Sequence, residues 1–332
     1  MSQERLPSLH RAVMVQEAME AIRPRTGGRY IDATLGGGTH SEELLKLSGP
    51  DGRVLSLDVD PAALERARAR QKTYGSRWRI VEANFRHLRQ EAEESGWAPF
   101  DGILFDLGLS SDELSDPSKG LSFQLAGPLD MRLGPKANDD GLTAATIVNR
   151  WSERELIELL RTYGEERYAA RIAQAIIRRR REKKFGSTLG LAQTILEAVP
   201  SVRHPDRAKT RGPERAARIH PATKTFQALR IAVNDELSAL RQALKAADAI
   251  LAPRGVIAVI AFHSLEDRIV KQTFKSYKNY QISKKPLRPT AAEVKNNPRA
   301  RSALLRAAHK NETINKINYV TDVCSRYDEA TP

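Results

Sequence analysis

Residues 29–41 read Arg-Tyr-Ile-Asp-Ala-Thr-Leu-Gly-Gly-Gly-Thr-His-Ser, and this stretch decides the fold. A strand-like apolar run ends at Asp32, passes through three glycines and enters a helical pattern at His40. Glycine allows a sharp turn and lets a ligand approach the backbone closely. The pattern predicts a strand, a tight turn and a helix start, which is the opening unit of an α/β nucleoside-binding domain.

A second acidic residue narrows the choice of cofactor. The strand-like run at 53–57 ends in Asp58, the position that holds ribose hydroxyls in such folds. The dinucleotide motif Gly-x-Gly-x-x-Gly is incomplete, because Gly36 and Gly38 are followed by Ser41 where the third glycine belongs. No Gly-Lys-Ser/Thr follows, so the P-loop pattern also fails. A plain glycine-rich loop is the alternative, but Asp58 favours S-adenosylmethionine, which has a ribose and no pyrophosphate.

The composition excludes several classes of protein. The chain of 332 residues is 40% hydrophobic and long enough for one or two domains with a sizeable core. Its single cysteine, Cys324, excludes an intramolecular disulfide and a cysteine-based zinc site, and the seven histidines show no metal-ligand spacing. The N-terminus does not resemble a signal peptide, and no apolar run approaches membrane-spanning length. We therefore expect a cytoplasmic protein with neither a metal nor a membrane partner.

The net charge of +13 is unevenly distributed along the chain. Residues 1–150 hold more acidic than basic side chains, so residues 151–332 carry the whole basic excess, including a dense run at 178–184. A solvated surface, or cations that suit a helix C-terminus, would explain part of this charge. An excess of this size is typical of proteins that bind phosphate backbones, so the pattern favours a nucleic-acid partner.

Strand-like and helix-like patterns alternate in the first part of the chain. The predicted strands lie at 29–35, 53–59, 78–83 and 101–107, with helices at 40–47, 61–72 and 86–95 between them. Asp60 and Pro61 are a good N-cap and first residue for the second of these helices. The alternation predicts a parallel sheet with right-handed crossovers.

The alternation stops after Ser111, and the second part of the chain is mostly helical. An irregular loop is predicted at 112–141, and a basic segment without periodicity at 201–221. The later patterns predict helices at 152–164, 168–184, 189–199, 223–251 and 265–277, and strands at 255–262 and 302–307. The economical interpretation is a discontinuous sheet domain, 1–112 and 216–332, interrupted by an all-helical domain at 113–215. Such an insertion leaves a strand at its carboxyl end, beside the ligand crevice, where it can recognise a substrate.

Two later strands run into polar residues at the same edge of the predicted sheet. Asp106 ends the strand at 101–107, which neighbours the first strand across the topological switch point, so Asp106 would face a cofactor. A turn-capping aspartate is the alternative. His263 follows the strand at 255–262, and a helix-capping or core role is the alternative there, since Ser264 with Asp267 partly resembles a capping box.

Six blocks together resemble the RsmH (MraW) family of S-adenosylmethionine-dependent methyltransferases. The blocks are Asp-Ala-Thr-Leu-Gly-Gly-Gly-Thr-His-Ser at 32–41 with Asp58, Asp-Leu-Gly-Leu-Ser-Ser at 106–111, Gly-Pro-Leu-Asp-Met-Arg at 127–132, the helix at 220–237, Phe-His-Ser-Leu-Glu-Asp-Arg at 262–268 and the basic block at 297–306. The resemblance runs from about His10 to Arg306. It implies a class I (Rossmann-like) methyltransferase sheet with an inserted helical substrate-recognition domain. It also implies methylation of N4 of a cytidine in 16S rRNA of the small ribosomal subunit, in the P-site region of the decoding centre.

The resemblance also implies which residues contact the cofactor, and the chemistry of the reaction suggests further candidates. The cofactor contacts carry over to Gly38, Thr39, His40, Asp58, Phe85, Asp106 and Glu113. Thr39 stands where the family has a further glycine, and Glu113 stands where it has glutamine. Asp106 is the candidate catalytic residue, because a carboxylate there could accept hydrogen bonds from the amine. The candidates to hold the base or its phosphate are Arg230, Asn234, His263 and Arg268.

Other functions remain open from the sequence. A non-catalytic RNA-binding protein could use the same scaffold, and ordinary surface polarity would explain the stripe formed by Arg230 and Asn234. The methyl group could also go to another rRNA site or to DNA. DNA amino-methyltransferases commonly carry Asn/Asp-Pro-Pro-aromatic, whereas residues 106–109 read Asp-Leu-Gly-Leu, which disfavours DNA.

Overall fold

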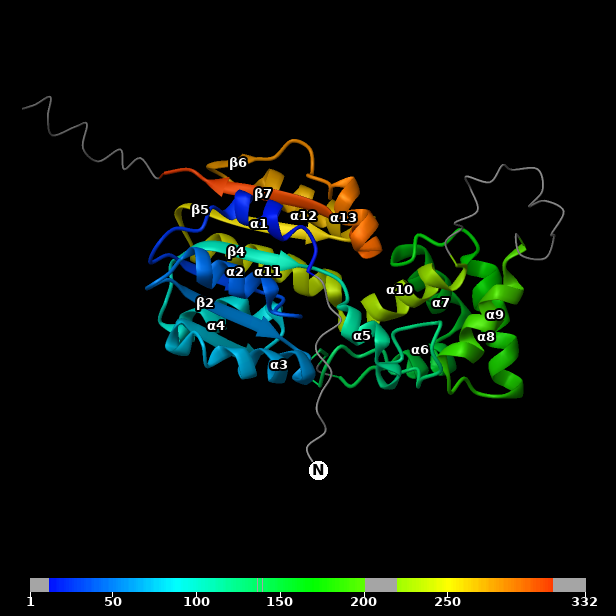
Figure 1. Ribbon diagram of the computed structural model, residues 1–332. Helices are drawn as coiled ribbons and strands as arrows, with labels where there is room; N and C mark the ends of the chain where they lie inside the picture. The colour runs from blue at the N-terminus through cyan, green and yellow to red at the C-terminus, as the bar shows by residue number, and fades with distance from the viewer. Residues whose placement is uncertain (1–11, 136, 139, 201–219, 313–332) are drawn as a thin grey trace, which may run out of the picture.

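The computed structural model describes residues 12–312 except 136, 139 and 201–219, and these form a sheet unit beside a helical unit (Figure 1). The strands are β1 (Arg29–Asp32), β2 (Arg53–Asp58), β3 (Trp78–Glu82), β4 (Phe100–Asp106), β5 (Leu251–Ala261), β6 (Tyr280–Ile282) and β7 (Leu304–Lys310). Their order in the sheet is β3-β2-β1-β4-β5-β7-β6; β1 to β5 run parallel and β7 runs antiparallel to β5. This order, with a reversed β7, confirms the predicted class I methyltransferase sheet.

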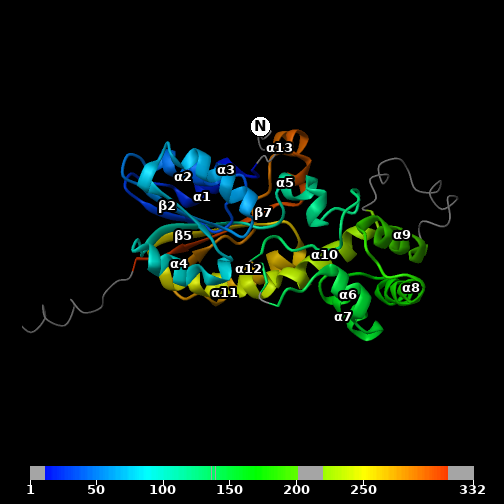
Figure 2. The ribbon, with the colours of Figure 1, turned by 90° about the horizontal axis from the view of Figure 1, so that it is seen from below.

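Helices cover both faces of the sheet (Figure 2). One face carries α1 (Val15–Ile22), α2 (Thr39–Leu47) and α3 (Pro61–Gln71), and the other carries α4 (Leu88–Ser95), α11 (Glu236–Ile250) and α12 (Ser264–Ser276). Because successive side chains of a strand point to opposite faces, Tyr30 joins the core under the first group and Ile31 joins the core under the second. The sheet is therefore buried on both sides, and its strand ends are free to form a site.

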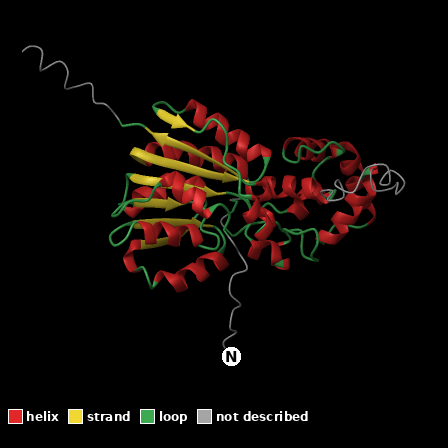
Figure 3. Ribbon diagram, turned by 45° about the horizontal axis from the view of Figure 1, so that its top comes forward, coloured by secondary structure: helices red, strands yellow, loops and turns green. Residues whose placement is uncertain are grey.

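The helical unit has a hydrophobic core of its own, and Figure 3 shows that the strands are confined to the sheet unit. It consists of α6 (Ala144–Arg150), α7 (Glu153–Thr162), α8 (Ala169–Glu182), α9 (Thr188–Ala198) and α10 (Ala222–Asn234). Phe226 and Leu229 of α10 belong to this core. We therefore propose that the boundary after the insertion lies at Asp235, in place of the expected boundary at 216. No helix in the described ranges is long and apolar enough to cross a membrane.

The structure differs from the predicted elements in several places. The expected helix at 223–251 is divided into α10 and α11 by Asp235, whose φ of 47° is left-handed. The expected loop at 112–141 contains α5 (Ser111–Ser115) and a short 3-10 helix at 117–119. Helices α1 and α13 (Ala291–Asn296) and strand β6 were not predicted. Most of the basic segment expected at 201–221 lies outside the described residues.

Candidate active site

The glycine turn between β1 and α2 requires left-handed backbone at two positions. The φ angle is 47° at Gly36 and 76° at Gly38, and both values favour glycine. A Cβ on Gly38 would lie 2.5 Å from the guanidinium of Arg70. Arg70 in turn donates to the carbonyl of Gly37 and pairs with Glu42 at 3.1 Å. Helix α3 therefore braces the turn through Arg70, and the turn itself lines a pocket.

Ser41, at the position of the missing third glycine, connects three elements of the sheet unit. Its hydroxyl donates to Asp32 at 2.6 Å and lies 2.7 Å from the hydroxyl of Ser56 in β2. The indole N–H of Trp78 in β3 donates to Ser56 at 2.8 Å. Burial raises the pKa of Asp32 to about 7. A series of side-chain hydrogen bonds therefore links the start of α2 to β1 and β2. In a dinucleotide-binding motif, a glycine at the position of Ser41 instead allows the helix to pack closely against the strand.

Asp58 supports the turn from the end of β2. Its Oδ2 accepts from the amide of Gly36 at 2.7 Å, and its Oδ1 accepts from the amide of Asp60 at 2.9 Å. Burial raises the pKa of Asp58, although the two amides favour the ionised form. Each carboxylate oxygen retains a second acceptor site, so two ribose hydroxyls could still donate to Asp58.

Asp106 ends β4 with a carboxyl group that is only partly satisfied. Its amide donates to the hydroxyl of Thr34 at 2.7 Å, which fixes the backbone beside β1. Its Oδ2 lies 3.6 Å from Nδ1 of the buried His40. Its Oδ1 is buried and has no hydrogen-bond partner among the described residues. Burial, followed by the nearby charges of Asp32 and Glu266, raises the pKa of Asp106 well above its usual range.

Phe85 and Glu113 approach from two further segments. Phe85 follows β3 and packs edge-on against Phe105, with ring centroids 6.1 Å apart. Glu113 belongs to the capping box of α5: its Oε2 accepts from the amide of Ser110 at 2.8 Å, and its amide donates to the Ser110 hydroxyl. Burial raises the pKa of Glu113 to about 7, and the ammonium of Lys119, 3.6 Å away, opposes this shift. Part of the Glu113 carboxylate is therefore occupied by its own helix.

One pocket collects every residue predicted to contact the cofactor. Its lining includes Gly38, Thr39, His40, Asp58, Phe85, Asp106 and Glu113. Asn234, from the substrate candidates, also lines it, whereas Arg230, His263 and Arg268 do not appear in its wall. The convergence follows from the fold, because the carboxyl ends of β1, β2 and β4 meet at one edge of the sheet. Contact of these residues with a cofactor remains a prediction.

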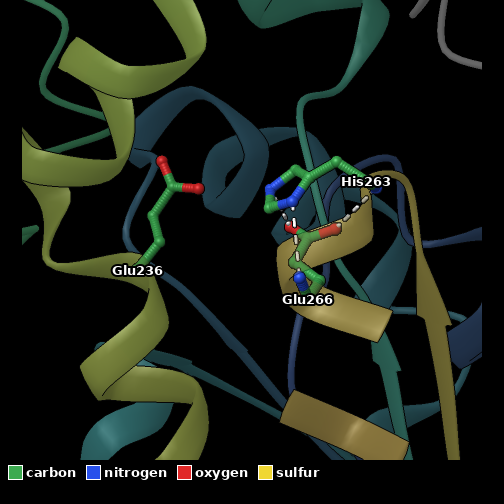
Figure 4. Close-up of side chains that lie close together, drawn as sticks. All are labelled: Glu236, His263 and Glu266. Atoms are coloured by element: carbon green, nitrogen blue, oxygen red, sulfur yellow. Dashed lines mark hydrogen bonds and ion pairs between the residues drawn. The ribbon is translucent and has the colours of Figure 1, made fainter. Parts of the chain in front are cut away.

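Three ionisable side chains gather at the edge of this pocket, from α11 and the start of α12 (Figure 4). The possible ligand atoms of Glu236, His263 and Glu266 all lie within 4.8 Å of one another, a spacing that a metal ion could bridge. Both carboxylates already have cationic or amide partners, however. Arg230 donates twice to Glu236, at 2.8 and 2.9 Å, and Glu266 accepts from the amide of Phe262 at 2.8 Å. The expected absence of a metal stays a prediction.

His263 forms the N-cap of α12, the alternative role that the sequence left open. Its Nδ1 accepts from the amide of Glu266 at 3.4 Å, while its Nε2 lies 3.1 Å from the Glu266 carboxylate. The capping box therefore pairs His263 with Glu266, and the interpretation of Ser264 with Asp267 as a capping box was wrong. Asp267 instead forms a two-bond ion pair with Arg306 of β7.

The other substrate candidates are held by the protein itself. The side-chain amide of Asn234 accepts from the amide of Leu133 at 2.9 Å and donates to the carbonyl of Met131 at 2.8 Å. Arg268 is half-exposed and pairs with Glu165 at 2.8 Å, a contact between α12 and the loop that follows α7. The Asn234 bonds hold the end of α10 against the segment at 131–133, and the Arg268 pair connects the sheet unit to the helical unit. A direct role of Asn234 or Arg268 toward a substrate remains a prediction.

Sequence reasoning missed three charged residues of the pocket wall. Glu236, Glu266 and Arg299 line it together with the predicted residues. The spacing of His263 and Glu266 is that of a capping box and could have directed attention to Glu266. No local pattern pointed to Arg299, because its place in the wall depends on β7 returning antiparallel beside β5.

Comparison with known proteins gives consistent results over almost the whole chain. A family model described as the MraW methylase family matches residues 7–311. A protein of Thermomicrobium roseum named ribosomal RNA small subunit methyltransferase H is 47% identical over 324 residues, covering 92% of this chain and 94% of that protein. A protein of the same name from Carboxydothermus hydrogenoformans is 46% identical, covering 91% and 97%.

Solved structures resemble the chain more distantly. A crystal structure described as a putative rRNA-methylase from Clostridium thermocellum matches with a TM-score of 0.43 at 12% identity. The match covers 90% of this chain and 98% of that one. TrmN from Thermus thermophilus matches with a TM-score of 0.41 at 13% identity, covering 90% of this chain and 48% of that one.

Proposed function

Since this chain belongs to the MraW methylase family, we propose that it methylates N4 of a cytidine in the 16S rRNA of the small ribosomal subunit. Its methyl donor is S-adenosylmethionine. The relatives named ribosomal RNA small subunit methyltransferase H support an rRNA substrate, because they match over more than nine-tenths of both chains. The assignment of the target to N4 of a cytidine, in the P-site region of the decoding centre, rests on the resemblance of the sequence blocks to the RsmH (MraW) family.

The observation that carries the proposal is the unpartnered carboxyl oxygen of Asp106, buried in the pocket that also contains the glycine turn and Asp58. A buried acceptor without a donor is unfavourable, so a ligand that brings a positive charge or an N–H group fits there. S-adenosylmethionine supplies an electrophilic methyl group on a cationic sulfonium, and the carboxyl groups of the pocket suit that charge. The residues present therefore fit this cofactor.

The chain offers a separate group for each part of the cofactor. Asp58 has acceptor capacity left for ribose hydroxyls, and the ring of Phe85 offers an apolar surface for the adenine. The glycine turn at 36–38 leaves its backbone open to close approach, and α2 begins directly after it with its first amides available to a carboxylate. Asp106 would lie toward the reacting end of the cofactor.

The amine of cytosine is a weak nucleophile, because its lone pair is delocalised into the ring. Asp106 can raise its reactivity by accepting an N–H hydrogen bond that orients the nitrogen toward the methyl carbon. The pocket as a whole, by holding the nitrogen near the methyl carbon, can supply roughly 7–11 kcal/mol of the barrier. The amine proton can leave after the transfer, so Asp106 need not act as a strong base.

The target cytidine must leave its stack to reach a pocket at the sheet edge, as other base-modifying enzymes require. The helical unit lies beside that edge, and α5 and α10 both reach the pocket (Figure 1). Helix α8 ends with exposed arginines, including Arg178 and Arg181. We propose that this basic surface binds phosphates of the rRNA while the nucleotide enters the pocket.

Mass spectrometry of 16S rRNA nucleosides tests the proposal most directly. We expect N4-methylcytidine to disappear in a deletion strain, to return with the wild-type gene and to stay absent with Asp106→Asn. Purified protein should restore the same nucleoside in small subunits from the deletion strain when S-adenosylmethionine is added. Unchanged N4-methylcytidine in the deletion strain, or methylation of a different nucleoside in vitro, would contradict the proposed target. Cofactor binding without any methyl transfer would favour the non-catalytic alternative.

A further inference from the structure

Arg299 introduces a positive charge into a pocket whose other charged walls are acidic. It lies in the short 3-10 helix Pro298–Ser302, between α13 and β7. Among the described residues that line the pocket, Arg299 is the only lysine or arginine, while the acids there are Asp58, Asp106, Glu113, Glu236 and Glu266. An acidic pocket repels the phosphates of RNA, so a substrate phosphate needs a local cation.

The guanidinium of Arg299 is not fully satisfied by the protein. Its Nη1 atom is buried and has no hydrogen-bond partner among the described residues. Burial lowers the pKa of Arg299, and the charges of Glu113 and Asp112 oppose that shift without removing the need for an acceptor. A buried N–H donor of this kind is unfavourable until a ligand supplies an oxygen.

Two anions could enter this pocket: the carboxylate of the cofactor and a phosphate of the RNA. The first amides of α2 are already placed to receive a carboxylate beside the glycine turn. The planar fork of arginine matches phosphate oxygens, and the other arginines considered as substrate contacts, Arg230 and Arg268, are each bound to a glutamate. Arg299 is therefore the cation still available for the substrate.

We propose that Arg299 binds a backbone phosphate of the target nucleotide and thereby positions its base against the carboxyl groups of the pocket. The inference rests on the proposed function, because it assumes an RNA substrate. It makes Arg299 a substrate-binding residue that belongs to the segment between α13 and β7. The cofactor site and the phosphate site would then lie within one pocket wall.

Three measurements on Arg299→Ala separate the two anions. The dissociation constant for S-adenosylhomocysteine, measured by calorimetry, should stay within about twofold of the wild type. With small subunits from a deletion strain as substrate, kcat/KM should fall roughly tenfold or more, mainly through KM. The dependence of rRNA binding on log salt should become less steep by about 0.7, the value for one phosphate of a single strand.

Two further variants serve as controls. Arg301→Ala removes the same charge from an exposed position of the same short helix and should leave KM for the subunit nearly unchanged. Arg299→Lys keeps the charge without the planar fork and should recover part of the lost kcat/KM. Thermal unfolding of all three variants should match the wild type, which excludes a folding defect as the cause.

Three outcomes would overturn the inference. An unchanged KM for the subunit in Arg299→Ala would show that no substrate phosphate binds there. Equal losses in the Arg299 and Arg301 variants would indicate a general electrostatic effect. Weaker binding of S-adenosylhomocysteine, but not of 5′-methylthioadenosine, would assign Arg299 to the carboxylate of the cofactor. If the wild-type product is not N4-methylcytidine, the proposed function fails, but the salt dependence still reports on Arg299.

Discussion

At the scale of single residues, the pocket contains several carboxyl groups whose negative charges repel one another. Burial and the charges of Asp32 and Glu266 raise the pKa of Asp106, so the free protein favours its protonated form. A cationic ligand beside Asp106 acts in the opposite direction, because a nearby positive charge stabilises a carboxylate. If the sulfonium binds beside Asp106, as we propose, its binding is coupled to release of a proton from that carboxyl group.

We predict that S-adenosylmethionine binds more tightly as pH rises and that its binding releases protons. A group whose pKa falls on binding must lose its proton when the cofactor enters, so high pH favours the complex. Calorimetry in buffers with different ionisation enthalpies measures the number of protons released. S-adenosylhomocysteine, whose sulfur is neutral, should release fewer protons than S-adenosylmethionine, and Asp106→Asn should lower the number for both. Equal proton release by the Asn variant and the wild type would rule Asp106 out as the source.

Some residues of the pocket could be placed from the sequence, whereas the contacts of others could not. The residues at the turn and the strand ends, such as Asp58 and Asp106, could be placed because parallel strands bring their carboxyl ends together. The partners of Arg230 and Arg268 could not, because an ion pair depends on the direction of side chains in the folded molecule. Ser41 shows a third case: its spacing excluded one motif, but its bonds to Asp32 and β2 required the structure.

At the scale of elements, the break between α10 and α11 shapes the pocket. Asp235 adopts a left-handed conformation there and pairs with Arg86 at 3.2 Å. The residues on either side, Asn234 and Glu236, both line the pocket. A continuous helix would turn one of them away, since side chains two positions apart in a helix point about 200° apart. The break therefore lets polar side chains from both helices, Asn234 of α10 and Glu236 of α11, line the same site.

Substitutions at Asp235 should reveal the cost of this backbone conformation. Asp235→Gly and Asp235→Val both remove the pair with Arg86, but only valine strains a positive φ angle. We expect the valine variant to be less stable than the glycine variant by about 1–2 kcal/mol. Urea unfolding of both proteins measures this difference. Equal stabilities would mean that the chain can straighten at Asp235 without penalty.

The helices and strands could be predicted where a local signal, such as a capping residue, agreed with the hydrophobic periodicity of the sequence. Strands β1 to β4 and the helices between them follow from alternation, and Asp60 caps α3 as predicted. The break at Asp235 was not predicted, because the apolar stripe continues through it and tertiary contacts decide the conformation. Short elements such as α5 and β6 were missed, because three to five residues show no measurable period.

At the scale of the whole molecule, a cluster of exposed arginines lies in the helical unit, whereas the strand ends that line the pocket belong to the sheet unit. The exposed end of α8 in the helical unit contains Arg178, Arg179 and Arg181. Arg180 differs from these, because its guanidinium donates to the carbonyls of Val148 and Trp151 and so holds α8 against the neighbouring helices. A test of RNA binding should therefore leave Arg180 intact.

Replacing Arg178, Arg179 and Arg181 together by alanine should weaken rRNA binding and flatten its dependence on log salt by about 2, at about 0.7 per phosphate contact. Filter binding at several salt concentrations measures both effects. The matched control removes three exposed cations from the sheet unit, Arg68, Arg241 and Lys245, and should change binding much less. Equal effects of the two triple variants would show that the helical unit is not the RNA-binding surface.

The stability of the molecule should fall as pH rises between about 4 and 7. Burial raises the pKa of Asp32 and of Glu113 to about 7, above their values in the unfolded chain. The folded state therefore binds more protons in this range, and the stability gained below it is lost as pH rises through the folded pKa. The difference is on the order of a few kcal/mol. Urea unfolding at pH 5.5 and 8 measures it, and a double variant Asp32→Asn, Glu113→Gln should flatten the profile.

The pairing of β4 with β5 has a consequence for the synthesis of the protein. Ile103 pairs with Ile257, although the whole helical unit lies between them in the sequence. The helical unit has its own core, so it can fold as it leaves the ribosome. At that stage β5, which pairs with β4 in the finished sheet, has not yet been synthesised. Joining such distant segments is slow, but a compact insertion brings its two ends closer than an unfolded one. We propose that the helical unit thereby also assists the folding of the sheet whose strand ends form the pocket.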